Sequence, residues 1–142
     1  MRLEKSYRMV GTELSIEYSA YESAMDRFLH PDKGSFVGRE ALVSSLESGL
    51  HYRLVTLEVM NVGDADALGK NALTLNGELI GRATGGGYGF RIGKSLALGM
   101  VTPEYASPDQ ELSIEILGQQ HKARVLQESP FDGKNKRLRD VN

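Results

Sequence analysis

The stretch that decides the fold is residues 71–101, NALTLNGELIGRATGGGYGFRIGKSLALGMV. Two β-rich runs in it flank Asn76-Gly77, a dipeptide that accepts positive φ at both central turn positions and therefore predicts a type I′ hairpin. The glycine run 85–89 is expected to separate this hairpin from 95–101, a small-residue apolar segment typical of a strand buried on both faces. The stretch therefore predicts an antiparallel meander.

Alternating patterns on both sides of this stretch predict further strands. Residues 52–59 alternate in the manner of a half-buried strand, and residues 111–117 and 121–127 do so again around a turn at 118–120. Residues 61–69 are acidic and rich in turn-forming types, so they are expected to form a surface loop. About six strands joined by short turns predict a mainly β fold, a six-stranded antiparallel β-barrel or sandwich.

The residues before the first strand predict helices, so the barrel is expected to carry a helical N-terminal extension. Apolar side chains recur at helical spacing in residues 2–10 and 19–30, and a third helix is expected at 38–48. The stripe in the first of these segments consists of Leu3, Tyr7 and Val10. A helix this short is marginal without packing, so its apolar face is expected either to dock on the barrel or to meet a missing domain or a second copy of the chain.

Composition places the chain among single-domain globular proteins. It has 142 residues, 25% of them charged, and a formal net charge of -2, so its charge gives no reason to expect nucleic acid as a partner. The absence of cysteine excludes disulfides, thiolate nucleophiles and cysteine-bound zinc. No apolar run approaches the roughly 18 residues of a membrane span, and the start lacks a secretory signal. We therefore expect no membrane contact and a cytoplasmic location, or the mitochondrial matrix in a eukaryote.

Several sequence features could carry chemistry, and each has a simpler interpretation. Glycines 85–87 could cradle a phosphate, but a strand pattern follows them where a phosphate loop needs a helix, so a tight crossover is favoured. Asp64 and Asp66 could act as an acid and base pair, yet surface loops are routinely acidic. The three histidines are too scattered for a metal site. The tail after Pro130 is expected to be a flexible, solvated end. Its cations are Lys134, Lys136, Arg137 and Arg139.

Three motifs in the chain resemble those of one enzyme family. Residues 2–14, RLEKSYRMVGTEL, resemble the pattern R-L-E-x-G-Y-R-x-x-G-x-E-L, and residues 36–42, FVGREAL, resemble F-I/V-G-R/K-E-A-L. Residues 76–97, from the Asn-Gly turn through Thr84 to Lys-Ser-Leu-Ala, resemble N-G-x-x-I/V-G-x-x-T-S-G followed by K-S-I/L-A. These patterns belong to the tetrahydrofolate-dependent aminomethyltransferase family, which includes the glycine-cleavage T-protein and the folate domains of dimethylglycine and sarcosine dehydrogenases.

The resemblance implies that the chain has three parts. Residues 1–34 correspond to the end of the family's folate-binding portion, residues 35–131 to its C-terminal β-barrel with one leading helix, and residues 132–142 to a flexible basic tail. The carboxylate that assists C–N cleavage in the family lies upstream, so no residue here corresponds to a catalytic group. The isolated chain is therefore expected to be inactive, although the family acts in the breakdown of glycine, sarcosine or dimethylglycine by one-carbon transfer.

The resemblance also implies a ligand and two contacts to it. Tetrahydrofolate is the implied cofactor, with Tyr7 and Lys134 as ligand-binding residues, and FAD enters only with an upstream dehydrogenase domain. The implied partners are missing N-terminal folate or flavin domains of a longer chain, or a homodimer formed through the N-terminal helix.

The chain departs from the family pattern at four positions. Ser6 and Ser23 stand where the family has glycine, Arg27 where it often has an aromatic residue, and Gly85 where it has serine. Two alternatives therefore stay open: a non-catalytic interaction or regulatory module on the same barrel, and a related folate-dependent demethylase.

Overall fold

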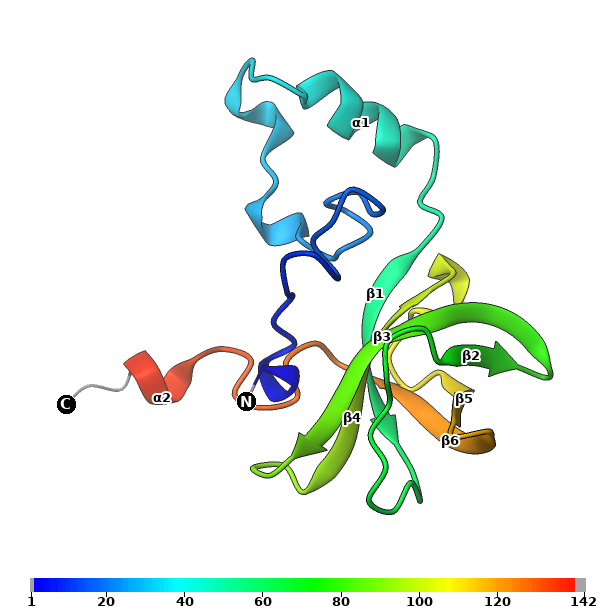
Figure 1. Cartoon of the computed structure of the whole chain (residues 1–142). Helices are drawn as coiled ribbons and strands as arrows, with labels where there is room; N and C mark the ends of the chain where they lie inside the picture. The colour runs from blue at the N-terminus through cyan, green and yellow to red at the C-terminus, as the bar shows by residue number, and fades with distance from the viewer. Residues whose placement is uncertain (1, 140–142) are drawn as a thin grey trace.

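A computed structural model describes residues 2–139 and shows a closed six-stranded antiparallel barrel with an N-terminal extension (Figure 1). Around the barrel the strands follow the order β1-β4-β3-β2-β5-β6, and β6 pairs with β1 to close it. The strands are β1 (Arg53–Val59), β2 (Ala72–Leu75), β3 (Glu78–Gly89), β4 (Lys94–Val101), β5 (Glu111–Ile116) and β6 (Gln119–Leu126). The mainly β prediction is confirmed, and the closed sheet decides for the barrel over the sandwich.

The predicted hairpin at Asn76-Gly77 is confirmed. Both residues have positive φ, 51° and 84°, and they join β2 to β3 with Leu75 opposite Glu78. Leu117 and Gly118 make the equivalent turn between β5 and β6, with φ of 51° and 76°. Two-residue turns of this kind match the twist of the strands that they join, so each fixes the register of its hairpin.

We expect Gly77→Val to lower the free energy of unfolding by about 1–3 kcal/mol, because a β-branched residue would be forced to positive φ. Chemical denaturation measures this change. Glu78→Val is the matched control, because position 78 is exposed and lies in a strand, where valine is well accommodated. An unchanged midpoint for Gly77→Val would contradict the type I′ turn.

The glycine run 85–89 does not separate two strands, so that prediction was wrong. These residues form the second half of β3 and pair with β4 from Gly85 opposite Leu98 to Gly89 opposite Lys94. The chain reverses later, at residues 90–93. Glycine at these positions lets neighbouring segments pack close to the strand and does not reverse the chain.

Alternate glycines of this run lie under the N-terminal segment. The 3-10 helix η1 (Leu3–Lys5) packs there: a Cβ added at Gly87 would lie 3.2 Å from Leu3 Cδ1, and one added at Gly89 would lie 3.1 Å from Glu4 Cγ. On the opposite face, a Cβ at Gly86 would lie 2.8 Å from the Cβ and carbonyl oxygen of Ala67. Strand β3 thus makes room for a neighbouring segment on each face.

The buried side chains form two groups, one inside the barrel and one on its outer face. The barrel interior contains residues from all six strands, among them Leu57, Leu73 and Ile114. Leu54, Leu98 and Met100 point to the outer face and pack against the N-terminal extension. Strand β4 is therefore buried on both sides, as its apolar sequence predicted.

The helical extension forms in part. Helix α1 (Arg39–Glu47) confirms the helix expected at 38–48. Residues 2–10 contain only η1, so the predicted helix there was wrong: Ser6 takes a left-handed φ of 53° and ends it. The predicted helix over 19–30 was also wrong: that segment has turns at 20–24 and only a short 3-10 helix after them. The remaining short helices are η2 (Asp26–Phe28), η3 (Pro31–Lys33), η4 (Pro103–Tyr105) and α2 (Lys136–Arg139).

Without the predicted helix over residues 2–10, the stripe of Leu3, Tyr7 and Val10 does not form one helical face. Leu3 packs on the barrel, whereas Tyr7 and Val10 are 48% and 82% exposed. Figure 1 shows α1 standing apart from the barrel, at the far end of the extension. None of the helices in residues 2–139 is long and apolar enough to cross a membrane.

Candidate functional site

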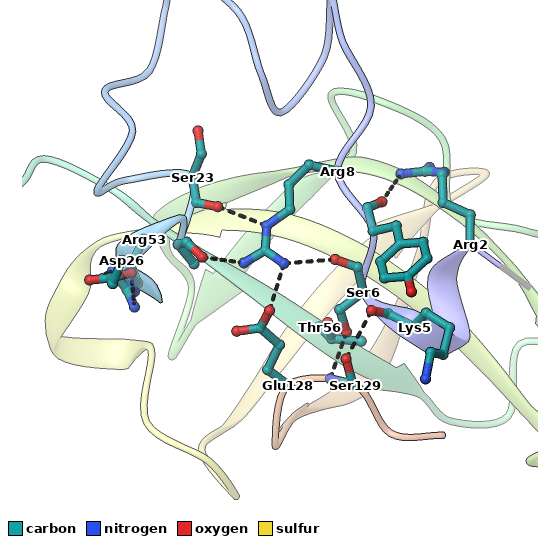
Figure 2. Close-up of polar contacts among 12 residues, drawn as sticks. Arg2, Lys5, Ser6, Arg8, Ser23, Asp26, Arg53, Thr56, Glu128 and Ser129 are labelled. Atoms are coloured by element: carbon teal, nitrogen blue, oxygen red, sulfur yellow. Dashed lines mark hydrogen bonds and ion pairs between the residues drawn. The ribbon is translucent and has the colours of Figure 1, made fainter. Parts of the chain in front are cut away.

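Two segments from opposite ends of the chain lie side by side on the barrel. We call residues 4–8 and 128–135 the seam. The Ser129 amide donates to Ser6 Oγ at 3.0 Å, Ser129 Oγ donates to the Lys5 carbonyl at 2.9 Å, and the Phe131 amide donates to the Glu4 carbonyl at 3.0 Å. Figure 2 shows Lys5, Ser6 and Ser129 meeting there beside Thr56 of β1. Both residues predicted to bind the ligand belong to the seam.

Tyr7 is held by its backbone and presents its ring to solvent. Its amide donates to the Arg2 carbonyl at 3.0 Å, and its carbonyl accepts from Arg2 Nη1 at 2.9 Å. Because the ring is about half exposed, it offers a face on which a flat aromatic group could stack. The ligand role of Tyr7 stays a prediction.

Lys134 is exposed in the turn that precedes α2, on the other segment of the seam. Lys5 fixes this turn: its Nζ donates to the carbonyls of Phe131 and Asp132 at 3.3 and 2.7 Å and to Asn135 Oδ1 at 2.6 Å. These bonds use the three donors of an ammonium group, so Lys5 is a structural cation. The ligand role of Lys134 also stays a prediction.

Cations also surround the ring of Phe131. The guanidinium carbons of Arg91 and Arg137 lie 5.3 and 5.2 Å from its centroid, within the range of cation–π attraction. Arg91 and Arg137 are both exposed. Two exposed cations therefore lie on the ring of Phe131, in the segment of the seam that also carries Lys134.

Arg8 fastens the seam to the rest of the extension, and its side chain is only 7% exposed (Figure 2). Nε donates to the Ser23 carbonyl at 2.9 Å, and Nη2 donates to the Ala24 carbonyl at 2.5 Å. Nη1 donates to the Ser6 carbonyl at 3.0 Å and to Glu128 Oε1 at 2.6 Å. One guanidinium thus joins three segments of the chain.

The two serines that stand in place of family glycines both use their hydroxyl groups. Ser6 has the left-handed φ that glycine accepts most easily, and its hydroxyl is hydrogen-bonded to Thr56 Oγ1 at 2.7 Å. Ser23 Oγ donates to the Glu13 carbonyl at 2.6 Å. These bonds offset the strain or crowding that a side chain brings. Arg27, in place of an aromatic residue, lies over the Phe28 ring at 4.6 Å.

Two buried carboxylates, those of Glu4 in the seam and Glu22 in the extension, accept backbone hydrogen bonds. Burial raises the pKa of Glu4, yet the pKa lies below its usual value, and the hydrogen bond from the Arg91 amide is the largest of the effects that lower it. Burial likewise raises the pKa of Glu22, and the amides of Ser19, Tyr52 and His51 lower it further than burial raises it. Both groups are therefore ionised at neutral pH, which does not suit a general acid.

We expect the bonds to Glu22 to make the protein less stable in acid. A carboxyl group whose pKa is lower when folded contributes stability above its unfolded pKa of about 4.5 and loses it as the pH falls through the folded pKa. The free energy of unfolding should therefore fall steeply below about pH 4.5. Glu22→Gln should make this pH dependence shallower, as measured by denaturation between pH 7 and pH 3. The matched control, Glu40→Gln, removes an exposed carboxyl group of α1, and an equally shallow slope there would contradict the assignment.

The other candidate chemistries find no support in the described part of the chain. Asp64 and Asp66 are both exposed in the loop, as expected of solvated acids. Glycines 85–87 lie within the β3–β4 ladder, so they form no phosphate loop. Within residues 2–139, no three His, Cys, Asp or Glu side chains gather as metal ligands would.

Sequence reasoning missed the residues that build the seam. Nothing in the local pattern marks Lys5, whose partners lie about 130 residues away. Arg8 did carry a signal, because it is the last residue of the R-L-E-x-G-Y-R match, but the motif does not say what it binds. Contacts between distant segments appear only in the folded chain.

The fold of the chain, a closed barrel with an N-terminal segment hydrogen-bonded to it, is similar to that of a solved structure. The glycine cleavage system aminomethyltransferase T from Bartonella henselae matches with a TM-score of 0.83 and 22% identity, over 93% of this chain and 37% of that one. This likeness shows the fold. The model of the glycine cleavage T-protein C-terminal barrel domain matches residues 53–132, more than half of the chain. The chain therefore belongs to the glycine cleavage T-protein family, through its C-terminal barrel domain.

Similar proteins include two kinds of enzyme. Mitochondrial dimethylglycine dehydrogenase of Rattus norvegicus is 34% identical over 129 residues, which is 90% of this chain and 15% of the rat protein. An aminomethyltransferase of Koribacter versatilis is 37% identical over 126 residues, which is 89% of this chain and 33% of that protein. The chain thus spans about a third of the aminomethyltransferase and less than a sixth of the dehydrogenase. The resemblance drawn from the motifs is confirmed.

Proposed function

We propose that this chain is the C-terminal domain of a tetrahydrofolate-dependent aminomethyltransferase-like protein and contributes part of the folate site. It would take part in one-carbon transfer during glycine, sarcosine or dimethylglycine breakdown, in the cytoplasm or the mitochondrial matrix. Chemistry at the one-carbon unit would come from a carboxylate outside these residues. The chain's own part is binding and orientation.

The observation that carries the proposal is the seam, because it brings the segments of Tyr7 and Lys134 together. Folate combines flat rings with carboxylates, and the seam offers an exposed aromatic residue, Tyr7, on one segment and an exposed cation, Lys134, on the other. Aromatic stacking and paired charges are the contacts that such a ligand uses. The donor set therefore fits tetrahydrofolate, with Tyr7 toward a ring and Lys134 toward a carboxylate.

The extension supports the idea that further domains complete the site. No residue of α1 is buried, and large apolar side chains of the extension face solvent. They are Tyr7, Met9, Val10, Ile16, Phe28, Val37 and Leu46. An excess of exposed large apolar side chains in one segment is a feature of surfaces that pack on a partner. Because the aminomethyltransferases are about three times as long as the matched region, we propose that this surface packs on the rest of such a protein.

We expect the isolated chain to bind tetrahydrofolate with a dissociation constant weaker than about 1 mM, because two or three contacts scarcely offset the entropy lost on association. NMR titration of the labelled chain should move the signals of Tyr7 and Lys134 first. The double variant Tyr7→Ala/Lys134→Ala should lose the accompanying shifts of the neighbouring residues of the seam.

Tyr88→Ala is the matched control, since Tyr88 is an equally exposed aromatic residue outside the seam. Micromolar binding by the isolated chain would contradict the dependence on further domains. Shifts that persist in the double variant would contradict the assignment of the ligand to the seam.

A further inference from the structure

The carboxylate of Glu13 lies beneath the loop that carries Tyr7, and its side chain is fully buried. Its Oε2 accepts from the Met9 amide at 2.8 Å and from Arg2 Nη1 at 3.5 Å. Its Oε1 accepts from Thr84 Oγ1 at 2.6 Å. A charge taken out of water needs such partners, and here they come from three separate parts of the chain.

Arg2 links this buried carboxylate to Tyr7. The Nη1 atom that faces Glu13 also donates to the Tyr7 carbonyl at 2.9 Å, and the Arg2 carbonyl accepts from the Tyr7 amide at 3.0 Å. The loop between η1 and the Val10–Leu14 bridge has no helix or strand of its own. Its conformation therefore depends on hydrogen bonds with other segments: Arg8 and Ser6 supply those to Ser23, Ala24 and Thr56, and Arg2 and Glu13 supply those at Tyr7 and Met9.

Thr84 ties the same network to the barrel. The register of β3 on β4 shifts between Ala83 and Gly85, so Thr84 is the extra residue of a β-bulge. A bulge redirects the side chain that it carries, and this one reaches Glu13. The Arg2 guanidinium lies over the next residue, Gly85: a Cβ added there would be 3.8 Å from its Nη2, an ordinary van der Waals contact.

We propose that Arg2, Glu13 and Thr84 are positioning residues that hold the backbone of Tyr7, so that its ring is presented to the ligand. This inference rests on the proposed function, because it requires that Tyr7 touch tetrahydrofolate. A buried ion pair is not needed for stability alone, since apolar packing often serves as well. The network therefore serves to fix the conformation of the loop.

Loosening the loop should weaken binding without unfolding the barrel. If the loop keeps the competent conformation only about a tenth of the time, the apparent affinity falls about tenfold. The slope of the Tyr7 shift against tetrahydrofolate concentration should therefore drop about tenfold in Arg2→Gln and in Thr84→Val. Arg2→Lys and Thr84→Ser keep a donor at each place and should restore most of the slope.

Arg82→Gln is the matched control on β3. Arg82 is exposed and binds Glu17 and Tyr18, outside the network, so this variant should keep the wild-type slope. Denaturation midpoints are measured for all variants as a check that the barrel stays folded. Hydrogen exchange of the Met9 amide in the free chain gives a second readout. Its rate should be higher in Arg2→Gln and Thr84→Val than in the wild-type chain.

The outcomes separate this inference from the proposed function. Wild-type slopes in Arg2→Gln and Thr84→Val would overturn the inference, and so would equal losses in the lysine and serine variants. No shift at Tyr7 in the wild-type chain would overturn the ligand role of Tyr7 itself. Exchange at Met9 then decides the positioning claim: faster exchange in the two variants supports it, and unchanged exchange overturns it.

Discussion

Gly81→Ala is expected to lower the free energy of unfolding by about 3 kcal/mol or more, the largest effect of any single methyl group added to the barrel. A Cβ at this position would lie 2.1 Å from the carbonyl oxygen of Met100 and 2.8 Å from the Cα of Val101. Both atoms belong to the backbone of β4, which pairs with β3 here. The two strands would have to move apart, because no rotamer change relieves a contact between backbone and Cβ.

Gly87→Ala is the matched control on the same strand. Its added Cβ would lie 3.2 Å from Leu3 Cδ1, the end of a flexible side chain that can turn away. We expect a cost of less than about 1 kcal/mol there, as measured by chemical denaturation. Equal costs at the two glycines would show that β3 and β4 are not as close at Gly81 as described.

Arg8→Ala is expected to destabilise the docked extension by about 3 kcal/mol, because it leaves three backbone carbonyls without their charged donor. The barrel strands should stay paired, since none of these bonds belongs to the sheet. Hydrogen exchange should therefore rise at Ser6 and Ser23 and stay slow in β4. Loss of protection across the whole barrel would contradict this separation.

Glu128→Gln tests the remaining bond of Arg8 by itself. The Glu128 side chain is 49% exposed, so solvent screens its charge and the ion pair contributes little. A loss of less than about 1 kcal/mol is expected in the same denaturation experiment. A loss as large as that of Arg8→Ala would place the anchor at the ion pair instead of the buried carbonyls.

The sequence predicted the strands well because the barrel has an interior and an exterior. That difference imposes a two-residue period, as in residues 52–59, and the Asn76-Gly77 turn adds a local backbone requirement that few other residues meet. The glycine run was misread, because glycine both breaks strands and lets other segments approach them. Only the position of η1 and Ala67 decides between these two roles.

Helices in the extension were predicted where apolar spacing was the sole guide. Residues 2–10 and 19–30 carry helical periodicity, but left-handed Ser6 and Ala24 interrupt the backbone, and contacts with the barrel outweigh local propensity. The candidate site was predictable only through family motifs, which supplied Tyr7 and Lys134. The roles of Lys5 and Glu13 could not be predicted from the sequence, because only the tertiary structure determines which residues they contact.

Closure of the barrel between β1 and β6 has a consequence for how the protein is made. On the ribosome β1 emerges first, yet Leu57 pairs with Ala97 on one side and with Val125 on the other. A nascent chain therefore carries this apolar strand without either neighbour until most of the domain has been translated. The contacts of the seam also form late, because residues 4–8 can bind Ser129 and Phe131 only after β6 has been synthesised. Long-range pairing of this kind slows folding and prolongs exposure to chaperones and to aggregation, so the apolar strand β1 is protected only when β6 and the segment after it have left the ribosome.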